Sequence, residues 1–280
     1  MQPEEKTIMK PGFSLSITLD AFNKRARTDD CLGQVAAISG ESIRIAREMN
    51  AEKLIFKARK EQTVHLLEKG FVLEACIPGY FLGSDCYLFS KYFTEHRRNS
   101  AFWTKEDLIL EEVTKLKRKP EIGSLPVGYG ARRAVLEDAD DLAALYSAVF
   151  EIYPVPMNDP EYIKKCMGKD TVFFICTFGG KIVSAASAEC SAVYHNAELT
   201  DCATLPDHRQ FGLMKILLSR LEEHLFENGT FCVYSIARSL SFGMNAAFHQ
   251  LDYTYKGRMA NNCYIFDKLE DMNVWVKNLA

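Results

Sequence analysis

The segment from Asn196 to Gly229, NAELTDCATLPDHRQFGLMKILLSRLEEHLFENG, constrains the fold more than any other part of the chain. It begins with an alternating, strand-like run and continues through a short basic turn that contains Gly212. A helix-like run follows, whose apolar residues recur on one face: Leu213, Ile216, Leu217, Leu221 and Leu225. A strand that enters a helix through such a turn is typical of an α/β fold.

The basic turn has two interpretations. The first turn of a helix leaves backbone N–H groups without partners and carries the positive end of the helix dipole. Arg209 and Gly212 add a cation and a residue without a Cβ, so the turn could hold a phosphate group. Turns with one glycine are common, however, and these residues alone favour a plain strand-to-helix connection.

Strand-like and helix-like segments alternate along the rest of the chain, which predicts a mixed α/β sheet. We expect a central hairpin over 171–190 and a strand followed by a terminal helix over 254–279. Charge runs and then Pro120, Gly123, Pro126 and Gly128 interrupt the pattern. We therefore predict an N-terminal α/β domain over 1–125 and a C-terminal domain over 126–280.

Residues 52–79 and 230–257 share one order of elements: strand, helix, strand, each followed by an aromatic-rich strand. The N-terminal part could thus be a degenerate half-copy of the C-terminal fold, and coincidence among α/β segments is the alternative. The N-terminal helix follows no basic glycine turn, so such a copy would have lost its ligand.

Composition limits the class of protein. The 280 residues carry a net charge of only −3 and no long basic arm, so nucleic acid and membrane surfaces are not expected partners. The first residues are polar, and no apolar run approaches a membrane span, which favours a cytoplasmic protein. Nine cysteines without a C-x-x-C motif favour a reducing compartment, and no metal site is expected.

The run from Arg209 to Met214 resembles the acetyl-CoA-binding motif [QR]-x-x-G-x-[GA] of the GNAT superfamily of N-acetyltransferases. Arg209 and Gly212 match, Met214 replaces the last small residue, and Gln210 stands where many members have another glycine. SIARSLSFGMN, YKGRMANNCYIF and LEDMNVWVK, with LDAFNKRARTDD near the N-terminus, resemble the β-lysine N-acetyltransferase family within it. That resemblance spans nearly the whole chain.

The resemblance implies a GNAT fold in the C-terminal part, with acetyl-CoA as donor and no metal. It implies acetylation of the side-chain amine of β-lysine, a small molecule, to give Nε-acetyl-β-lysine, a compatible solute, and leaves a homodimer open. Another amine, such as α-lysine, a polyamine or an aminoglycoside, is the first alternative. A non-catalytic acyl-CoA-binding module is the second.

Acetyl transfer needs a neutral amine, and deprotonating an alkylamine at pH 7 costs on the order of 4–5 kcal/mol. A carboxylate can take that proton. Glu198 is the first candidate base, because it stands where some GNAT enzymes carry a catalytic glutamate. Asp201 is the second; ideal alternation places it on the opposite face of the strand, and a bulge would bring both together. These acids could instead be rim charges.

The resemblance also assigns residues to acetyl-CoA. The strand end at Cys202, Ala203, Thr204 and Leu205 would line the thioester and supply an oxyanion-binding amide, with Cys202 itself structural. The pyrophosphate would contact Arg209, Gln210, Phe211, Gly212, Leu213 and Met214. Asn245 would bond the pantetheine arm or cap its own helix. Phe248 replaces a tyrosine that acts as general acid in many members, which leaves Tyr253, Tyr264 or unaided departure of the thiolate.

Four residues are candidates for substrate binding. Glu189 lies in the strand before Glu198 and could flank the same pocket. Tyr153 could form an aromatic wall beside an ammonium group, or pack in the core. Arg238 could pair with a substrate carboxylate, or with an acid across the sheet. Asn262 could line the pocket, although a turn is favoured there.

Overall fold

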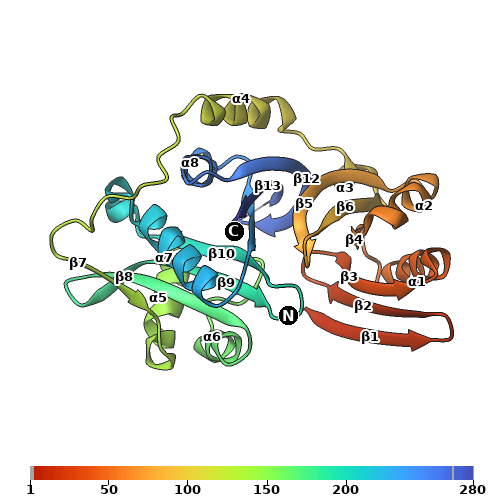
Figure 1. The fold of residues 1–280 in the computed structure, drawn as a ribbon, viewed down its shortest axis with the longest axis horizontal. Coiled ribbons are helices and arrows are strands. Elements are labelled where there is room, and N and C mark those ends of the chain that lie inside the picture. Colours follow the sequence, from red (N-terminus) through yellow and green to blue (C-terminus); the bar gives the residue numbers. More distant parts are fainter. Residues whose placement is uncertain (1–2, 267, 280) are drawn as a thin grey trace.

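The computed structural model describes residues 3–266 and 268–279, and these form one continuous thirteen-stranded sheet (Figure 1). Its strand order is β1-β2-β3-β4-β6-β5-β12-β13-β11-β10-β9-β8-β7. The strands are β1 (Glu4–Lys10), β2 (Phe13–Asp20), β3 (Arg25–Gly33), β4 (Lys53–Ala58), β5 (Val72–Phe81), β6 (Ser84–Tyr92), β7 (Tyr129–Arg133), β8 (Thr171–Phe178), β9 (Lys181–Ser191), β10 (Asn196–Thr204), β11 (Cys232–Arg238), β12 (Thr254–Ile265) and β13 (Lys268–Asn278).

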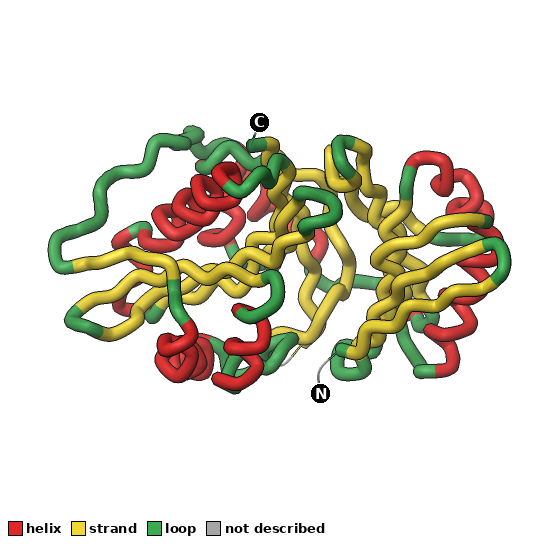
Figure 2. The backbone as a smooth tube through the Cα atoms, turned by 60° about the horizontal axis from the view of Figure 1, so that its bottom comes forward, coloured by secondary structure: helices red, strands yellow, loops and turns green. Residues whose placement is uncertain are grey.

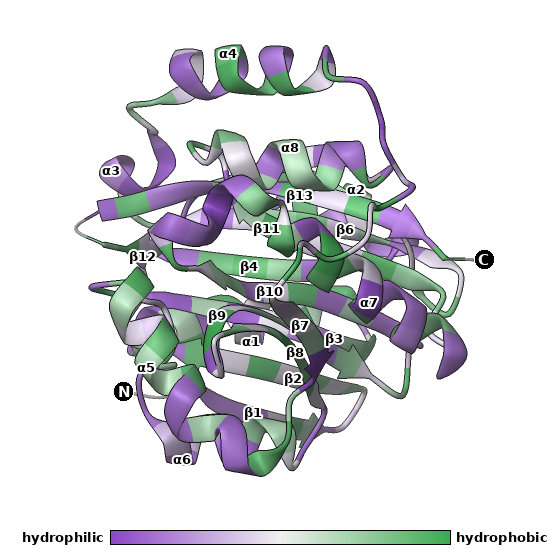
Figure 3. Ribbon diagram, turned by 90° about the vertical axis from the view of Figure 1, so that its left-hand side faces the viewer, coloured by the Kyte–Doolittle hydropathy of each residue, from purple (hydrophilic) through white to green (hydrophobic). Residues whose placement is uncertain are grey.

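Helices cover the sheet on both faces, and several carry hydrophilic and hydrophobic residues on different sides (Figure 3). None of those formed by the described residues is long and apolar enough to cross a bilayer. The α-helices are α1 (Val35–Glu48), α2 (Thr63–Glu68), α3 (Glu95–Arg98), α4 (Trp103–Thr114), α5 (Ala139–Val149), α6 (Pro160–Met167), α7 (Leu213–Glu227) and α8 (Phe242–Gln250). Short 3-10 turns are η1 (Lys60–Gln62), η2 (Leu136–Asp138) and η3 (Pro206–Phe211).

The C-terminal half, β7 to β13 with α5 to α8, buries a separate core on each face of its sheet. Helices α7 and α8 pack over one face through Leu217, Leu221 and Phe248. Helices α5 and α6 pack over the other through Leu142 and Ile163. The mixed α/β sheet expected for this half is therefore present, with helices on both faces.

The N-terminal half, β1 to β6 with α1 and α2, repeats the order of elements in the C-terminal half. The series β3-α1-β4-α2-β5-β6 corresponds to β10-α7-β11-α8-β12-β13. Each series opens with two parallel strands, β3 with β4 and β10 with β11. The two halves meet at β5 and β12 (Figure 1), and Figure 2 shows strands and helices in both halves. We infer that the N-terminal half is a degenerate copy of the C-terminal half. The domain boundary near residue 125 stays a prediction.

The junction between the halves is a close backbone contact. Gly257 of β12 lies opposite Ala75 of β5, at φ +136°, and a Cβ there would come 2.2 Å from the Glu74 carbonyl oxygen. The Glu74 carboxylate accepts from the Ala260 amide at 2.9 Å and pairs with Lys53 at 2.9 Å. Lys53 of β4 is fully buried and also donates to the Ala260 carbonyl oxygen at 2.7 Å. The ion pair therefore holds both backbone polar groups of Ala260 and ties β12 to β4 and β5.

The predicted terminal helix is wrong, because residues Lys268–Asn278 form β13. This strand lies between β12 and β11, and both of its faces are buried. Val274 and Val276 pack into one core, while Trp275 packs into another. A strand buried on both sides lacks the alternation of polar and apolar residues by which a half-buried strand is found in a sequence. The sequence analysis also missed β1, β3 and α4.

We predict that Gly257→Ala destabilises the protein by about 2–3 kcal/mol or more, because the added methyl group overlaps the backbone of β5. Urea unfolding followed by circular dichroism measures this change. Gly40→Ala in α1 is the matched control, since nothing lies within 4 Å of its Cβ position. We expect that control to be neutral or slightly stabilising. Equal unfolding midpoints for Gly257→Ala and the wild type would contradict the close contact.

Candidate active site

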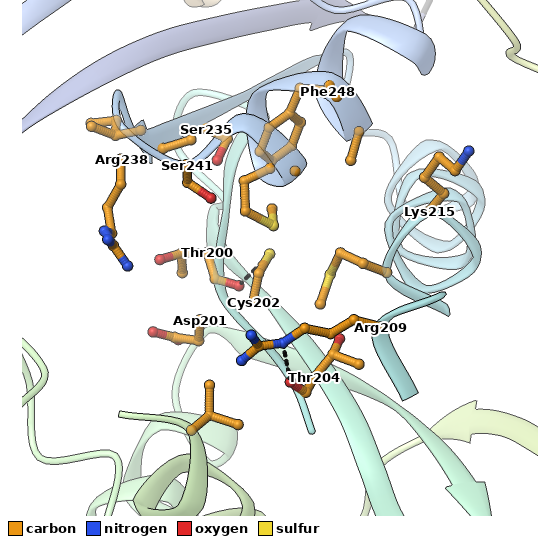
Figure 4. A pocket seen from close by; sticks show the side chains of 18 of the residues that line it. Thr200, Asp201, Cys202, Thr204, Arg209, Lys215, Ser235, Arg238, Ser241 and Phe248 are labelled. Carbon is orange, nitrogen blue, oxygen red and sulfur yellow. Dashed lines mark hydrogen bonds between the residues drawn. The ribbon is translucent and has the colours of Figure 1, made fainter. Parts of the chain in front are cut away.

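A first cavity, of about 690 Å³, opens where two central strands separate. Strands β10 and β11 pair only from Asn196 to Glu198 and then diverge, although both continue further. Thr200 and Cys202 line the cavity from β10, and Ser235 and Ala237 line it from β11 (Figure 4). Backbone groups along this edge of β10 therefore face a cavity instead of a neighbouring strand.

The other end of this cavity reaches the first turn of α7. Gly212 precedes that helix at φ +68°, a left-handed conformation that favours glycine. Arg209 lies at the rim, where its Nε donates to the Thr204 carbonyl oxygen at 3.1 Å (Figure 4). Gly212, Leu213, Met214 and Lys215 line the cavity beside it. This end combines the start of a helix, where the first backbone N–H groups generally lack intrahelical partners, with the cations Arg209 and Lys215. Such an arrangement suits an anion.

A bulge in β10 brings the predicted acids onto one face of the sheet. Glu198 lies directly opposite Glu189 of β9. The register then shifts between Thr200 and Ala203, and Asp201 takes φ +48°. Asp201 consequently points to the same side as Glu198 and accepts a hydrogen bond from Ser187 of β9. The sequence analysis expected Glu198 and Asp201 to share a face only if this strand contained a bulge, and the bulge is present.

Asp201 is held by three hydroxyl groups. The Ser187 and Tyr153 hydroxyls donate to its carboxylate at 2.6 and 3.1 Å, and the Tyr146 hydroxyl donates to its backbone carbonyl at 2.7 Å. Asp201 is only 6% exposed, and this burial raises its pKa to about 6, against the lowering effect of the hydrogen bonds from Ser187 and Tyr153. Its carboxyl group is thus mainly ionised at neutral pH and close to the range of a general base.

A second cavity, of about 650 Å³, lies on the face of the sheet that Asp201 and Glu198 share. It meets the first cavity at Tyr153, Thr200 and Asp201, which line both. Both halves of the chain build it, and its walls carry charges of both signs: Asp20, Asp170, Glu189, Glu198 and Asp201, with Arg25, Arg27, Lys57, Lys165 and Lys169. Such a space suits a small molecule with both ammonium and carboxylate groups.

Glu189 and Glu198 face each other across β9 and β10, whereas Asp201 is held by hydroxyl groups. Enclosure by the cavity walls and repulsion from Glu198 and Asp201 raise the pKa of Glu189 above its ordinary value. The Glu189 side chain remains accessible to water inside the cavity, which moderates the effect of burial. An ammonium group between Glu189 and Glu198 would relieve their repulsion.

Several residues assigned to acetyl-CoA do not line the first cavity. Ala203 is buried in the core under α5, and the Leu205 amide donates to the Val183 carbonyl oxygen at 3.0 Å. Phe211 packs against Tyr129, 5.3 Å between ring centroids, and Gln210 lies in the same exposed turn. The Leu205 amide is therefore not available to an oxyanion. Cys202, Thr204, Arg209, Gly212, Leu213, Met214 and Phe248 do line it.

The Asn245 side chain is buried and makes four hydrogen bonds. Its Nδ2 donates to the carbonyl oxygens of Arg238 and Ser241, at 2.9 and 2.7 Å. Its Oδ1 accepts from Asn273 and Trp275, at 2.9 and 2.8 Å. All of its polar groups are thereby used within the protein, and it does not line the cavity.

The tyrosines considered as general acids lie elsewhere. Tyr253 is fully buried behind Phe248, with ring centroids 5.0 Å apart. Tyr264 packs against Phe22, with ring centroids 6.4 Å apart. Neither lines the first cavity. Burial raises the pKa of the Cys202 thiol, so this side chain is a protonated cavity wall and not a thiolate.

Arg238 and Asn262 occupy different cavities. Arg238 lines the first cavity, 3.4 Å from Glu270 and with its guanidinium 4.9 Å from the Phe266 ring centroid. Asn262 lies in a bulge of β12 and lines the second cavity. Its side chain is almost completely buried, and its Oδ1 has no hydrogen-bond partner among the described residues. Asn262 thus forms part of the wall of the second cavity, while its Oδ1 is buried.

The sequence analysis missed the contribution of the N-terminal half. Arg25 and Arg27 of β3 and Lys57 of β4 line the second cavity, together with Tyr80 of β5. One signal was present: in RARTDD, the arginines Arg25 and Arg27 alternate with Ala26 and Thr28. Ala26 and Thr28 are buried, and the two arginines face the other side. No pattern in the sequence, however, places this face opposite Glu198.

The fold and the site are those of an acetyltransferase. The family model described as "Acetyltransferase (GNAT) family" matches residues 140–250, which include the bulged strand, the turn at Gly212 and α8. The members of this family are acetyltransferases. Among solved structures, the ribosomal-protein-S18-alanine N-acetyltransferase from Escherichia coli matches with 18% identity and a TM-score of 0.48, over 54% of this chain and 94% of that chain.

Curated relatives narrow the class. N-acetyltransferase YodP from Bacillus subtilis is 36% identical, over 98% of this chain and 99% of that protein. Beta-lysine N(6)-acetyltransferases from Methanosarcina mazei and Methanococcus maripaludis are 35% and 34% identical, over 89% and 83% of this chain and 100% and 85% of those proteins. The chain therefore belongs to the β-lysine N-acetyltransferase family of the GNAT acetyltransferases.

We predict that Asp201→Asn stabilises the folded protein at pH 8 by about 1–3 kcal/mol, because it removes a buried charge. The pKa of Asp201 is raised in the folded state, so its ionisation disfavours folding as pH rises from about 4 through about 6. The advantage of the variant should therefore shrink between pH 8 and pH 4. Urea unfolding at both pH values measures it, and a variant less stable than the wild type at pH 8 would contradict the account.

Proposed function

We propose that this protein transfers the acetyl group of acetyl-CoA to the side-chain amine of β-lysine, giving N6-acetyl-β-lysine, for use as a compatible solute. One observation carries the proposal: a cavity between splayed strands meets a charged cavity at Asp201. The names of two relatives, which are similar along most of their length, support the choice of amine.

The first cavity fits acetyl-CoA. The pantetheine arm would lie along the β10 edge beyond Glu198, where backbone groups lack a strand partner in β11. The pyrophosphate would lie at the first turn of α7, with Arg209 and Lys215 beside it. The left-handed Gly212 lets the backbone turn into the helix there without a side chain in the way. The thioester would then reach Asp201.

The second cavity fits the acceptor. Glu189 and Glu198 would bind an ammonium group, since two facing carboxylates disfavour each other until a cation lies between them. Asn262 would form part of the wall beside this ammonium group. The reacting amine would lie where the two cavities meet, beside Asp201.

Asp201 would act as the base. It takes one proton from the substrate ammonium, and the neutral nitrogen attacks the thioester carbon. The thioester oxygen becomes an oxyanion and is stabilised by amides on the open β10 edge. The C–S bond then breaks, and the CoA thiolate leaves as the amide forms. The nitrogen would lose its second proton through water to this thiolate, since Tyr253 and Tyr264 do not line the first cavity.

For chemistry, we predict that Asp201→Asn lowers kcat for β-lysine about 100-fold or more, because an amide cannot accept the proton. Glu198→Gln should instead raise KM for the amine and change kcat less. Release of the CoA thiol, with β-lysine, α-lysine, a polyamine and an aminoglycoside in parallel, measures these values. Preference for another amine would replace β-lysine as the substrate, and CoA binding without turnover of any amine would indicate a non-catalytic module.

For the donor, we predict that Gly212→Glu raises the Kd for CoA at least about 10-fold. The new carboxylate would repel the pyrophosphate, and a side chain at φ +68° costs about 1–2 kcal/mol. Gly40→Glu on the exposed side of α1 introduces the same charge away from both cavities and should leave the Kd unchanged. Calorimetric titration with CoA distinguishes them; equal affinities in both variants would remove this turn from the cofactor site.

A further inference from the structure

We propose that Arg27, in the N-terminal half, binds the carboxylate of the amino-acid substrate and so selects amino acids over plain diamines. The inference rests on the proposed function for the identity of the amine. It gives the N-terminal half a role in specificity, which neither the GNAT motif nor the match over residues 140–250 assigns to it.

The position of Arg27 follows from the alternation of β3. Ala26 is fully buried in the core under α1, and Thr28 bonds to Ser42 of that helix at 3.0 Å. Arg27, between them, therefore points to the opposite face, where it lines the second cavity with Glu198. Its side chain is 35% exposed, so a small molecule can reach it.

Neighbouring groups hold Arg27 in place without using its whole guanidinium. Its Nε donates to Asp29 at 2.5 Å, whereas Nη1 and Nη2 bond to no group in the described part of the chain. Asp29 also accepts from Thr18 at 2.6 Å and pairs with Lys57 at 3.0 Å. The terminal nitrogens can therefore donate to a ligand carboxylate, with an orientation that Asp29 fixes in advance.

The charges of the cavity match an amino acid that carries extra amines. The β9–β10 wall presents Glu189 and Glu198, and the β3–β4 wall presents Arg27 and Lys57, of which Asp29 neutralises only one charge. A ligand with ammonium groups at one side and a carboxylate at the other would satisfy both walls. A plain diamine would leave the cationic wall without an anion.

Other cations of the site are less suited to the substrate carboxylate. Arg25 already donates to Asp20 at 2.9 Å and to the Asn262 carbonyl oxygen at 3.2 Å. Lys57 bonds to Asp29 and to the Tyr80 hydroxyl, each at 3.0 Å. Arg238, the candidate from the sequence, lines the first cavity and lies beside Glu270. Among the arginines of the described residues that line the second cavity, Arg27 alone has two parallel donors without a partner in the protein.

The test compares β-lysine with 1,4-diaminopentane, which is β-lysine without its carboxylate. We expect the wild type to prefer β-lysine. Arg27→Gln should lower kcat/KM for β-lysine about 10- to 100-fold, mainly through KM, and leave kcat/KM for 1,4-diaminopentane within about 3-fold. Arg27→Lys should retain part of the preference. Arg44→Gln, on the exposed side of α1, removes an arginine outside the cavity and should change neither substrate.

Equal losses on both substrates, or no loss on either, would overturn the role of Arg27. An unchanged Kd for CoA in Arg27→Gln checks that the cofactor cavity stays intact. If the wild type turns over α-lysine and not β-lysine, the proposed substrate fails, and the same comparison is made with α-lysine and 1,5-diaminopentane. If no amine is turned over, the proposed function fails, and calorimetric binding of β-lysine to wild type and Arg27→Gln still decides the inference.

Discussion

The contact between Gly257 of β12 and Ala75 of β5 is the constraint on which the rest of the structure depends. Only glycine can bring the two backbones so close, and the buried Lys53–Glu74 pair then fastens the junction. Removing one partner of such a pair typically costs about 3–5 kcal/mol. Through this junction the strands of both halves form one sheet, and the face that carries Arg27 is continuous with the face that carries the acids of the acetyltransferase half.

The bulge in β10 determines where the Asp201 side chain lies. Regular pairing would have pointed this side chain into the core under α7, away from Glu198. The bulge instead places it where a donor cavity and an acceptor cavity meet, and hydrogen bonds from Ser187 and Tyr153 keep it there. Burial of a carboxylate costs free energy, and here it also raises the pKa of Asp201 to about 6, a value suited to accepting a proton near neutral pH.

The sequence alone predicted much of the C-terminal half, because its signals are local. The strand, the turn at Gly212 and the leucine-faced α7 follow one another, and the acids are spaced so that a bulge would unite them. Other features depend on distant partners. Residues Lys268–Asn278 look helical until neighbouring strands bury both of their faces. Arg27 looks like a solvated charge until the junction at Gly257 brings it over a cavity with Glu198. Single-sequence patterns carry no information on such pairings.

A crystal structure of the protein with CoA and β-lysine would test the central claim most directly, namely that two adjoining cavities hold the two substrates with Asp201 between them. We predict the CoA sulfur between the splayed strands β10 and β11, the side-chain amine of β-lysine beside Asp201, and its carboxylate on Arg27. A β-lysine molecule bound outside the charged cavity, or oriented with its carboxylate toward Glu198, would contradict the account.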